Sequence, residues 1–267
     1  MQAQVTLLFV PGDRPERFAR AAASGAGGVL VDLEDAVAPD RKTSARDAAV
    51  AWLATYDGFL RINAVDTAWY DEDVAALTAA RRLRGVVLPK STTADQVNAV
   101  VGALPAGVPL LALVESAVGI RESAAIAEVP GVVRLLFGSI DFALDTGITP
   151  SGPDEPELLW ARSALVVASR AAGLPAPLDG VYTRLDDEAG LVASSRRSRG
   201  FGFGGRLCVH PRQVEPVQRA WRPTEAEREW ARRVLSAAGS FRGAAVRVDG
   251  QMIDRPRLEL ARALLAR

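Results

Sequence analysis

The segments LLALVES (110–116) and VVRLLFGSID (132–141) each consist of a short apolar run followed by a carboxylate, Glu115 or Asp141. Apolar runs of this length, bounded by small or polar residues, are typical of strands in a buried parallel sheet. A carboxylate just past such a strand needs water, a cation or a hydrogen-bonding substrate. Because both strands would end at the same edge of one sheet, we expect the two carboxylates to share a crevice and form a hard-cation site.

The same alternation of apolar runs and helix-like segments extends along most of the chain. The runs that we expect to be strands are 5–10, 29–35, 59–63, 85–90, 110–116, 132–141, 177–182 and 204–211. Eight strand–helix units predict an α/β fold, a closed (β/α)8 TIM barrel. A doubly wound sheet would require a glycine-rich turn directly after a strand, and neither GAGG (25–28) nor GFGFGG (200–205) has that position. We place the catalytic barrel at 1–240 and a C-terminal helical tail at 241–267.

Composition and charge exclude several classes of protein. The 267 residues are 49% hydrophobic, enough for a sizeable core, and 32 basic residues balance 32 acidic ones. No basic stripe is interleaved with aromatic residues, so we expect no nucleic-acid partner. Cys208 is the only cysteine, which excludes a disulfide framework, and its apolar strand predicts an inert thiol. The first apolar run is too short for a signal peptide, and none approaches the roughly 20 residues that cross a bilayer. We expect a cytoplasmic protein with no membrane partner.

Polar side chains gather near the predicted strand ends, which face the active site in a barrel. In chain order they are Arg14, Asp32, Glu34, Asp35, Arg61, Lys90, Glu115, Asp141 and His210. This combination of cations and acids suits a substrate that carries a carboxylate and is held against a divalent cation.

Eight segments spread over nearly the whole chain match the motifs of a known family. They are PGDRPERF (11–18), VLVDLEDAVAPDRKTSAR (29–46), LRIN (60–63), VVLPK (86–90), LVESAVGI (113–120), LLFGSIDFALDTG (135–147), CVHPRQV (208–214) and VDGQMIDRP (248–256). In this order they resemble the citrate lyase beta-subunit-like (CitE-like) members of the HpcH/HpaI aldolase superfamily. The resemblance places the chain near the malyl-CoA and citramalyl-CoA lyases.

The resemblance implies a barrel enzyme that depends on Mg2+, with Mn2+ as an alternative. Such an enzyme cleaves or forms a carbon–carbon bond between a 2-oxo acid and an acyl-CoA, so that a coenzyme A thioester is a substrate. Glu115 and Asp141 match the magnesium ligands, and two carboxylates suffice because Mg2+ keeps several waters. The alternative for either residue is a cap on the following helix. The family also implies a homo-oligomer, a trimer or hexamer, whose 241–267 tail contacts a neighbouring subunit.

Arg61, in LRIN, matches the arginine that binds the substrate carboxylate, for which a planar guanidinium is well suited. The alternative is a salt bridge to Asp32, Glu34 or Asp35 on the neighbouring strand. Glu34 and Asp35 would accept hydrogen bonds from metal-bound water or from the Arg61 guanidinium, or have a purely structural role. Lys90 would pair with Glu34 or with the glutamate of LVES.

The resemblance also implies roles for the remaining motif residues. Gly138 and Ser139 would offer backbone N–H groups to the 2-oxo acid. Arg14 would contact the coenzyme A phosphates or the substrate mouth, or be a solvated surface arginine. Asp254, in MIDRP, matches an aspartate that reaches a neighbouring subunit's site and exchanges a proton with the substrate, with a helix N-cap as the alternative. For His210 we expect a structural hydrogen-bonding role.

These observations predict a Mg2+-dependent carbon–carbon lyase acting on a thioester of the malyl-CoA or citramalyl-CoA type. Its products would be glyoxylate or pyruvate plus acetyl-CoA. Two alternatives stay open. One is a citrate lyase beta-like subunit that converts a citryl thioester to oxaloacetate in a carrier complex. The other is an aldolase that acts on free hydroxy-oxo acids.

Overall fold

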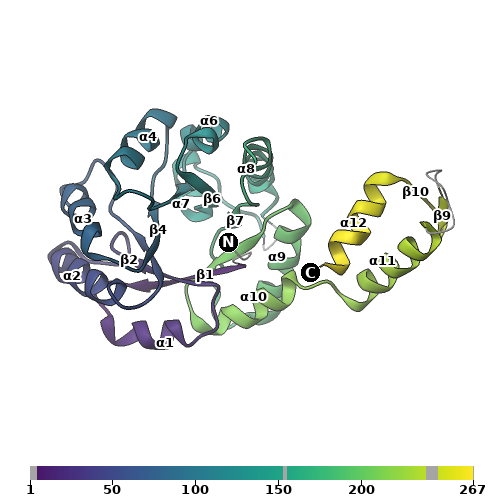
Figure 1. Cartoon of the computed structure of the whole chain (residues 1–267), viewed down its shortest axis with the longest axis horizontal. Helices are drawn as coiled ribbons and strands as arrows, with labels where there is room; N and C mark the ends of the chain where they lie inside the picture. The colour runs from purple at the N-terminus through teal and green to yellow at the C-terminus, as the bar shows by residue number, and fades with distance from the viewer. Residues whose placement is uncertain (1–4, 153–154, 239–245, 267) are drawn as a thin grey trace. The chain divides into compact units, whose positions relative to one another are not determined.

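A computed structural model of the chain describes residues 5–152, 155–238 and 246–266. Eight parallel strands close into a barrel in sequence order, and β8 pairs with β1 (Figure 1). The strands are β1 (Thr6–Pro11), β2 (Gly28–Asp32), β3 (Gly58–Arg61), β4 (Leu83–Leu88), β5 (Leu110–Val114), β6 (Val132–Phe137), β7 (Leu178–Asp179) and β8 (Gly205–Cys208). The predicted (β/α)8 barrel is confirmed.

Helices follow the strands and surround the barrel. They are η1 (Pro15–Arg17), α1 (Phe18–Ala22), η2 (Pro39–Arg41), α2 (Lys42–Leu53), α3 (Tyr70–Ala76), η3 (Leu77–Ala79), α4 (Ala94–Ala103), α5 (Ala117–Arg121), α6 (Ser123–Glu128), α7 (Ser139–Thr146), η4 (Pro156–Leu158), α8 (Leu159–Ala171), α9 (Glu188–Phe201), η5 (Pro211–Gln213) and α10 (Val214–Trp221). None of the helices among the described residues is both long and apolar enough to cross a membrane.

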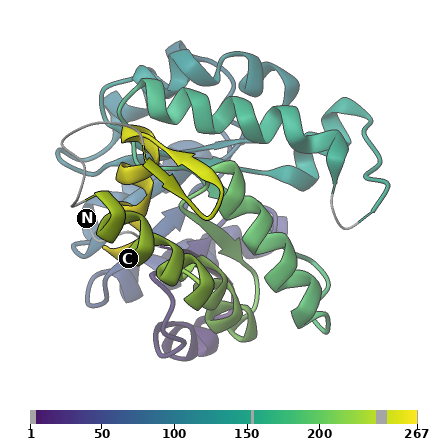
Figure 2. The same cartoon turned by 90° about the vertical axis from the view of Figure 1, so that its right-hand side faces the viewer.

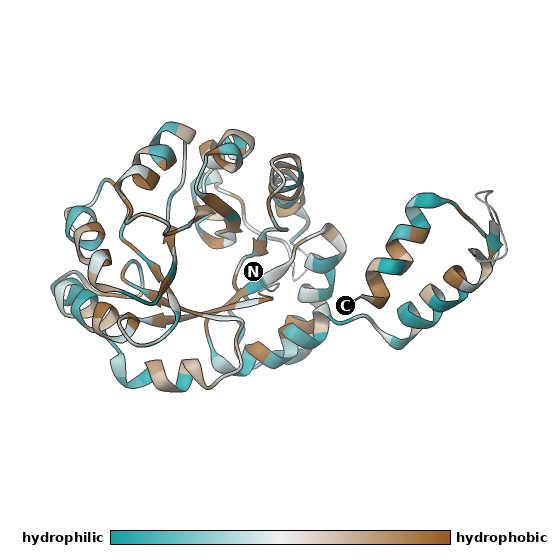
Figure 3. Ribbon diagram, viewed as in Figure 1, coloured by the Kyte–Doolittle hydropathy of each residue, from teal (hydrophilic) through white to brown (hydrophobic). Residues whose placement is uncertain are grey.

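The barrel core is built from one or two apolar side chains of every strand. The buried cluster comprises Leu7, Leu30, Phe59, Val87, Leu111, Leu113, Leu136, Leu178 and Leu207. Each such side chain, when fully buried, stabilises the fold by about 1.5–3 kcal/mol relative to an exposed one. Figure 3 shows the strands as mostly apolar, whereas the surrounding helices alternate between apolar and polar faces. The apolar strands therefore fix the frame, and the polar chemistry is left to the loops that follow them.

Several of those loops end in helix caps that the sequence specifies. The Thr93 hydroxyl accepts a hydrogen bond from Gln96 N at 3.2 Å at the start of α4. The Ser116 hydroxyl accepts one from Gly119 N at 3.1 Å at the start of α5. Such caps satisfy backbone donors that have no partner within the helix. The cap at Ser116 therefore fixes the chain directly after Glu115.

The remaining described part of the chain forms a second compact unit. The first unit spans Met1–Arg219 and the second Ala220–Arg267. The boundary expected at residue 240 lies outside the described residues, and the division comes earlier, because α11 (Glu225–Ala238) packs on α12 (Arg255–Leu265). The buried core of this unit comprises Ala231, Val234, Val248, Ile253, Ala261 and Leu264.

The second unit also contains a hairpin that the expected helical tail did not include. Strands β9 (Val246–Val248) and β10 (Gln251–Ile253) pair antiparallel (yellow in Figure 2). The two turn residues, Asp249 and Gly250, have φ values of 50° and 78°. An Asp-Gly pair with both residues left-handed is a favoured two-residue hairpin turn. The short apolar pair of this segment is therefore part of a strand.

Candidate active site

The strand register places a carboxylate and a guanidinium side by side at the carboxyl ends of β2 and β3. Asp32 and Arg61 are direct partners in the ladder. Arg61 Nε donates to Asp32 Oδ1 at 2.6 Å and Nη2 donates to Oδ2 at 2.7 Å, while Nη1 lies 2.7 Å from Glu34 Oε2. Burial alone would lower the pKa of Arg61, but Asp32 and Glu34 raise it above its usual range. Arg61 is therefore a permanent cation.

The guanidinium of Arg61 keeps donors for a ligand. A guanidinium has five N–H groups. Two bond to Asp32, and Nη1 is ion-paired with Glu34 without a hydrogen bond, so that N–H groups on both Nη1 and Nη2 remain for a ligand. Two parallel N–H groups of this kind can hold a carboxylate through both oxygens. The expected salt bridges of Arg61 are thus present, and they leave room for the expected substrate role.

Glu34 and Lys90 form the next layer of the site. Glu34 Oε1 accepts a hydrogen bond from Lys90 Nζ at 3.0 Å, and the Glu34 side chain is buried. Burial raises the pKa of Glu34, and Asp35 adds to this, although Arg61 and Lys90 oppose it. Lys90 has a φ of 49°, in the left-handed region that a non-glycine residue rarely adopts. The predicted pairing of Lys90 with Glu34 is present.

Glu115 is a buried carboxylate with little compensation. Its side chain is only 4% exposed, and its Oε1 accepts one hydrogen bond from Lys90 N at 2.7 Å. Burial raises the pKa of Glu115 to about 8; the Lys90 N–H opposes this, and Asp141 and Glu34 add to it. The register that aligns Val114 with Phe137 places Glu115 beside Gly138, where any Cβ would collide with the glutamate. The glycine at position 138 therefore leaves the space that the Glu115 side chain occupies.

Two cavities meet at the carboxylates. One, of about 340 Å³, contains polar groups opposite an apolar wall and is lined by Phe9, Asp32, Asp35, Ala36, Arg61, Leu113, Glu115, Phe137, Gly138, Ser139, Ile140, Asp141, Val181, Leu207 and Val209. The other, of about 560 Å³, is more polar and is lined by Ala64, Val65, Asp66, Lys90, Thr92, Gln96, Glu115, Ser116, Asp141, Leu144 and Asp145. Glu115 and Asp141 line both cavities, so a group bound between them is accessible from either.

The donor set fits a hard cation that keeps its water. Among the described residues, no three His, Cys, Asp or Glu side chains gather as a complete metal cage. Two carboxylates with open space on both sides suit Mg2+, which retains several waters and takes one or two protein carboxylates. The raised pKa of Glu115 marks a negative charge that a cation would stabilise. The residues present therefore fit a magnesium ion.

Other predicted site residues lie close to this pair. Asp141 is in the first turn of α7 and not directly after β6, and it is partly exposed. Gly138 and Ser139 line the smaller cavity at the start of the same helix. Asp35 also lines this cavity, and its side chain is 57% exposed. The structure thus brings these four residues around the opening.

Three predicted residues are not among the described residues that line either cavity. Arg14 is exposed, lies 3.9 Å from Asp13 through its Nε, and is not among the described residues that line either cavity. Asp254 is in the second unit, where its carboxylate accepts a hydrogen bond from Arg257 N at 3.3 Å and caps α12. His210 Nδ1 accepts from Arg212 N at 3.1 Å and caps η5, the structural role expected for it.

Cys208 is a buried strand residue. Its side chain is 0% exposed, and burial raises the pKa of its thiol to about 12. The thiolate is the nucleophilic form of cysteine. The expected inert thiol is therefore consistent with the structure.

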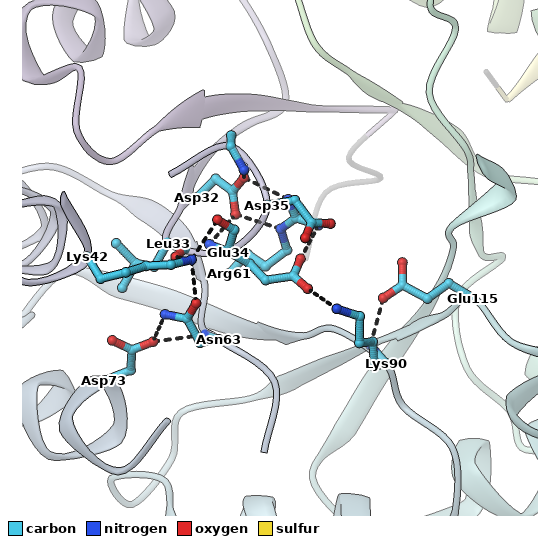
Figure 4. A network of polar contacts seen from close by, with 11 residues as sticks. Asp32, Leu33, Glu34, Asp35, Lys42, Arg61, Asn63, Asp73, Lys90 and Glu115 are labelled. Carbon is cyan, nitrogen blue, oxygen red and sulfur yellow. Dashed lines mark hydrogen bonds and ion pairs between the residues drawn. The ribbon is translucent and has the colours of Figure 1, made fainter. Parts of the chain in front are cut away.

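A buried polar network behind the site did not emerge from the sequence. Lys42 Nζ donates to Leu33 O, Glu34 O and Asn63 Oδ1, and Asp73 accepts from Asn63 (Figure 4). Asp73 also accepts a hydrogen bond from Arg46. The signal lies in the spacing of α2, whose buried residues are Lys42, Ala45, Arg46, Ala49 and Leu53. Two cations share the core-facing stripe of this helix, where apolar residues are the rule.

Comparison with known proteins identifies the family of this chain. Residues 5–211 match the family model described as HpcH/HpaI aldolase/citrate lyase. The chain is 36% identical to a citrate lyase subunit beta-like protein of Deinococcus radiodurans, over 98% of this chain and 96% of that protein. It is 34% identical to a (3S)-malyl-CoA thioesterase of Cereibacter sphaeroides, over 98% and 93% of the two chains.

A solved structure is similar over almost the whole length. CitE from Mycobacterium tuberculosis, in complex with magnesium, acetoacetate and coenzyme A, superposes with a TM-score of 0.90 at 36% identity, covering 99% of this chain and 98% of that one. The family match and these identities extend over the strands that bear Arg61, Glu115 and Gly138. The chain therefore belongs to the HpcH/HpaI aldolase/citrate lyase family and is a carbon–carbon lyase.

Proposed function

We propose that the chain is a cytoplasmic Mg2+-dependent lyase that cleaves or forms a malyl-CoA or citramalyl-CoA type thioester. The observation that supports this is the buried, under-compensated Glu115 beside Asp141, with the free fork of Arg61 lining the same cavity. Glu115 and Asp141 would hold the ion, with Mn2+ as a substitute. When bound, Mg2+ supplies a Lewis acid for the 2-oxo oxygen.

The side chains around the ion divide the remaining work. Arg61 binds the carboxylate of the 2-oxo half through free N–H groups of Nη1 and Nη2, and Ser139 and Gly138 border this half from the start of α7. The apolar wall excludes water from the carbon that becomes nucleophilic. In the cleavage direction the hydroxyl proton leaves, the bond between the two halves breaks, and its electron pair becomes the thioester enolate. Protonation of that enolate carbon yields acetyl-CoA.

The charge of the smaller cavity supports glyoxylate or pyruvate over oxaloacetate. Among the described residues that line it, Arg61 is the one cation, and its free donors match a single carboxylate. Oxaloacetate has a second carboxylate that would enter a space walled by Phe9, Leu113 and Val181. A buried charge without a partner is costly. We therefore favour malyl and citramalyl thioesters over the citryl alternative.

The direct test is turnover of four candidate substrates. Malyl-CoA, citramalyl-CoA, citryl-CoA and a free 4-hydroxy-2-oxo acid are incubated with the purified chain, with Mg2+ or with EDTA, and 2-oxo acid and CoA products are followed separately. We expect glyoxylate or pyruvate together with acetyl-CoA, only with Mg2+. Cleavage of citryl-CoA alone would favour the citrate lyase alternative, and cleavage of the free acid alone would favour an aldolase. No carbon–carbon cleavage of any of the four would contradict the proposal.

A thioesterase is the second candidate, because one relative is named for that activity on (3S)-malyl-CoA. The products distinguish the two reactions. Hydrolysis of malyl-CoA releases malate and a free thiol without glyoxylate, whereas lyase action releases glyoxylate and leaves the thioester intact. Thiol titration alongside an aldehyde assay on the same sample therefore decides between them.

We further propose a homo-oligomer, a trimer or hexamer, in which Asp254 of a neighbouring copy exchanges the proton at the enolate carbon. The supporting observation is that Asp254 lies in a separate compact unit beyond the barrel. Complementation tests this. E115Q and D254N variants, each of low activity alone, should regain activity when unfolded together and reassembled, because hybrid oligomers contain sites with both residues intact. No recovery in verified hybrids would rule out action from a neighbour.

A further inference from the structure

The buried ammonium group of Lys42 donates hydrogen bonds to the peptide groups on either side of Glu34. Lys42 Nζ donates to Leu33 O at 2.7 Å and to Glu34 O at 2.8 Å (Figure 4). These are the carbonyls of the peptide groups before and after Glu34. Gripping both fixes the backbone dihedral angles of that residue, and with them the direction of its side chain. Lys42 is only 5% exposed, so water does not compete for these bonds.

The third bond of the ammonium ties this turn to the strand that bears Arg61. Lys42 Nζ donates to Asn63 Oδ1 at 2.7 Å, and Asn63 follows Arg61 by two residues. Asp73 Oδ2 in turn accepts from Asn63 N at 2.8 Å and from Asn63 Nδ2 at 2.6 Å. An ammonium has three donors, and all three of Lys42 are used. The group is therefore saturated, and it has no proton free for chemistry.

The carboxylate of Glu34 transmits this constraint to the cavity. One of its oxygens lies 2.7 Å from Arg61 Nη1 and the other accepts from Lys90 Nζ at 3.0 Å. The contact with Nη1 is an ion pair, since this buried Glu34 oxygen accepts no hydrogen bond. The direction in which Arg61 presents its outer N–H groups to a ligand therefore depends on where the charge of Glu34 is held.

We propose that Lys42 is a positioning residue for the lyase reaction, which fixes both peptide groups of Glu34 so that Arg61 presents its free N–H pair to the 2-oxo acid. This rests on the proposed function. Residues that orient the groups in contact with a metal or substrate typically contribute 10–100-fold to affinity or activity. The three hydrogen bonds of Lys42 do not go to the two proposed metal-binding carboxylates, and Lys42 is not among the described residues that line either cavity. Its loss should therefore affect the 2-oxo acid and spare the metal.

Helix α2 supplies a matched control. Arg46 lies one turn after Lys42, is equally buried at 6% against 5%, and bonds Asp73 at 2.7 Å, on the far side of Asn63. Lys42→Met and Arg46→Met each remove one buried cation from the same face of the same helix. A purely structural role for Lys42 predicts that both variants lose stability and activity in the same proportion.

The experiment compares wild type, K42M and R46M in the synthesis direction. We expect K42M to raise the KM for glyoxylate or pyruvate, with kcat/KM lowered roughly 10–100-fold, and to keep Mg2+ affinity within about threefold by calorimetry. R46M should retain kcat/KM within about threefold at a similar unfolding midpoint. In the E34Q background, K42M should have little further effect, because it acts through Glu34. Equal kinetic losses in K42M and R46M, or full additivity with E34Q, would overturn the proposal.

Two additions keep the test decisive. If K42M does not fold, Lys42→Arg replaces it, since a planar guanidinium keeps the charge but cannot aim donors at three converging oxygens; the same selective loss is expected. The rate at which phenylglyoxal modifies Arg61, read by peptide mass spectrometry, needs no turnover. It should rise in K42M and not in R46M. An unchanged rate contradicts the positioning role, whereas absent wild-type turnover contradicts the proposed function only.

Discussion

Two charge clusters in the barrel combine acids and cations in opposite proportions. The mouth cluster comprises Asp32, Glu34, Arg61, Lys90 and Glu115. The β7–β8 cluster comprises Arg162, Asp179, Ser198 and Arg206. In the β7–β8 cluster a single acid meets two arginines: Asp179 Oδ1 accepts from Arg162 Nε at 3.1 Å, and Oδ2 accepts from Arg206 Nη2 at 2.9 Å and from the Ser198 hydroxyl.

The charge balance sets the pKa shifts in opposite directions. Burial alone would raise the pKa of Asp179, but Arg206 and Arg162 outweigh it, so that its pKa is lowered. In the mouth cluster acids outnumber cations, and burial raises the pKa of both Glu34 and Glu115. With Glu155, which pairs with Arg162, the β7–β8 cluster balances two acids against two arginines, whereas the mouth cluster is short of one positive charge. The lack of a compensating positive charge, and not burial, distinguishes the candidate site from a structural ion pair.

Removing the negative charge of Glu115, which leaves the mouth cluster short of a cation, should have the largest effect on activity. Glu115→Gln should lower turnover about a thousandfold or more, because a metal supplies several kcal/mol of charge stabilisation and each 1.4 kcal/mol is a factor of ten. The same variant should be more stable than wild type in EDTA at pH 9, where a buried carboxylate is costly. Steady-state kinetics and urea unfolding measure the two effects. Asp145→Asn, an acid in the larger cavity that bonds Ala117 N, should match wild type in both; an equal loss there would contradict the assignment.

Breaking the complete cluster should instead affect stability. Asp179→Asn leaves the buried Arg206 without its acid and removes one of the two acids of Arg162, and breaking a buried pair typically costs about 3–5 kcal/mol. Urea unfolding checks this. Glu155→Gln is the control, because Glu155 pairs with Arg162 at 2.5 Å but is 31% exposed, and such pairs are worth about 1 kcal/mol or less. Similar losses in the two variants would mean that burial does not set the value of this cluster.

The pH dependence of stability should separate the clusters. Because the pKa of Glu115 is raised, its contribution to the stability of the metal-free protein is fully present at acidic pH. This contribution is lost as the pH rises toward about 8. The lowered pKa of Asp179 means that its contribution is present at neutral pH and is lost as pH falls through that lowered pKa, in the acid range. Thermal unfolding in EDTA from pH 3 to 9 should therefore show two limbs. E115Q should flatten the alkaline limb and D179N the acid one, and Mg2+ should flatten only the alkaline limb. A single limb common to all variants would contradict this assignment.

The smallest expected effect concerns the strained link between Lys90 and Glu115. Lys90→Gly and Lys90→Ala both lose the ammonium but keep the N–H that donates to Glu115. Only glycine accommodates a positive φ without strain, so the glycine variant should be more stable by about 1 kcal/mol. Urea unfolding of the pair measures this. An alanine variant at least as stable as the glycine one would mean that this backbone conformation stores no strain.

The contrast also explains what the sequence could predict. Runs such as LLALV and the polar residues that end them determine the barrel and place Glu115 and Arg61 at one rim, because side chains past the strand ends share that rim. Lys42 could not be identified, since its partners are main-chain carbonyls that only the packing of α2 brings together. Asp141 was expected directly after its strand and lies within α7, because boundaries between elements depend on capping. The roles of Arg14 and Asp254 stay predictions.

The buried thiol of Cys208 makes the chain a natural single-label protein. Because this sulfur is the only one of its kind in the sequence and is both enclosed and hard to ionise, maleimide reagents at neutral pH should ignore it. One engineered cysteine at the exposed Met252 would then take up a fluorophore without any background mutation. Fluorescence from that position would report, in real time, how the second unit responds when a thioester binds.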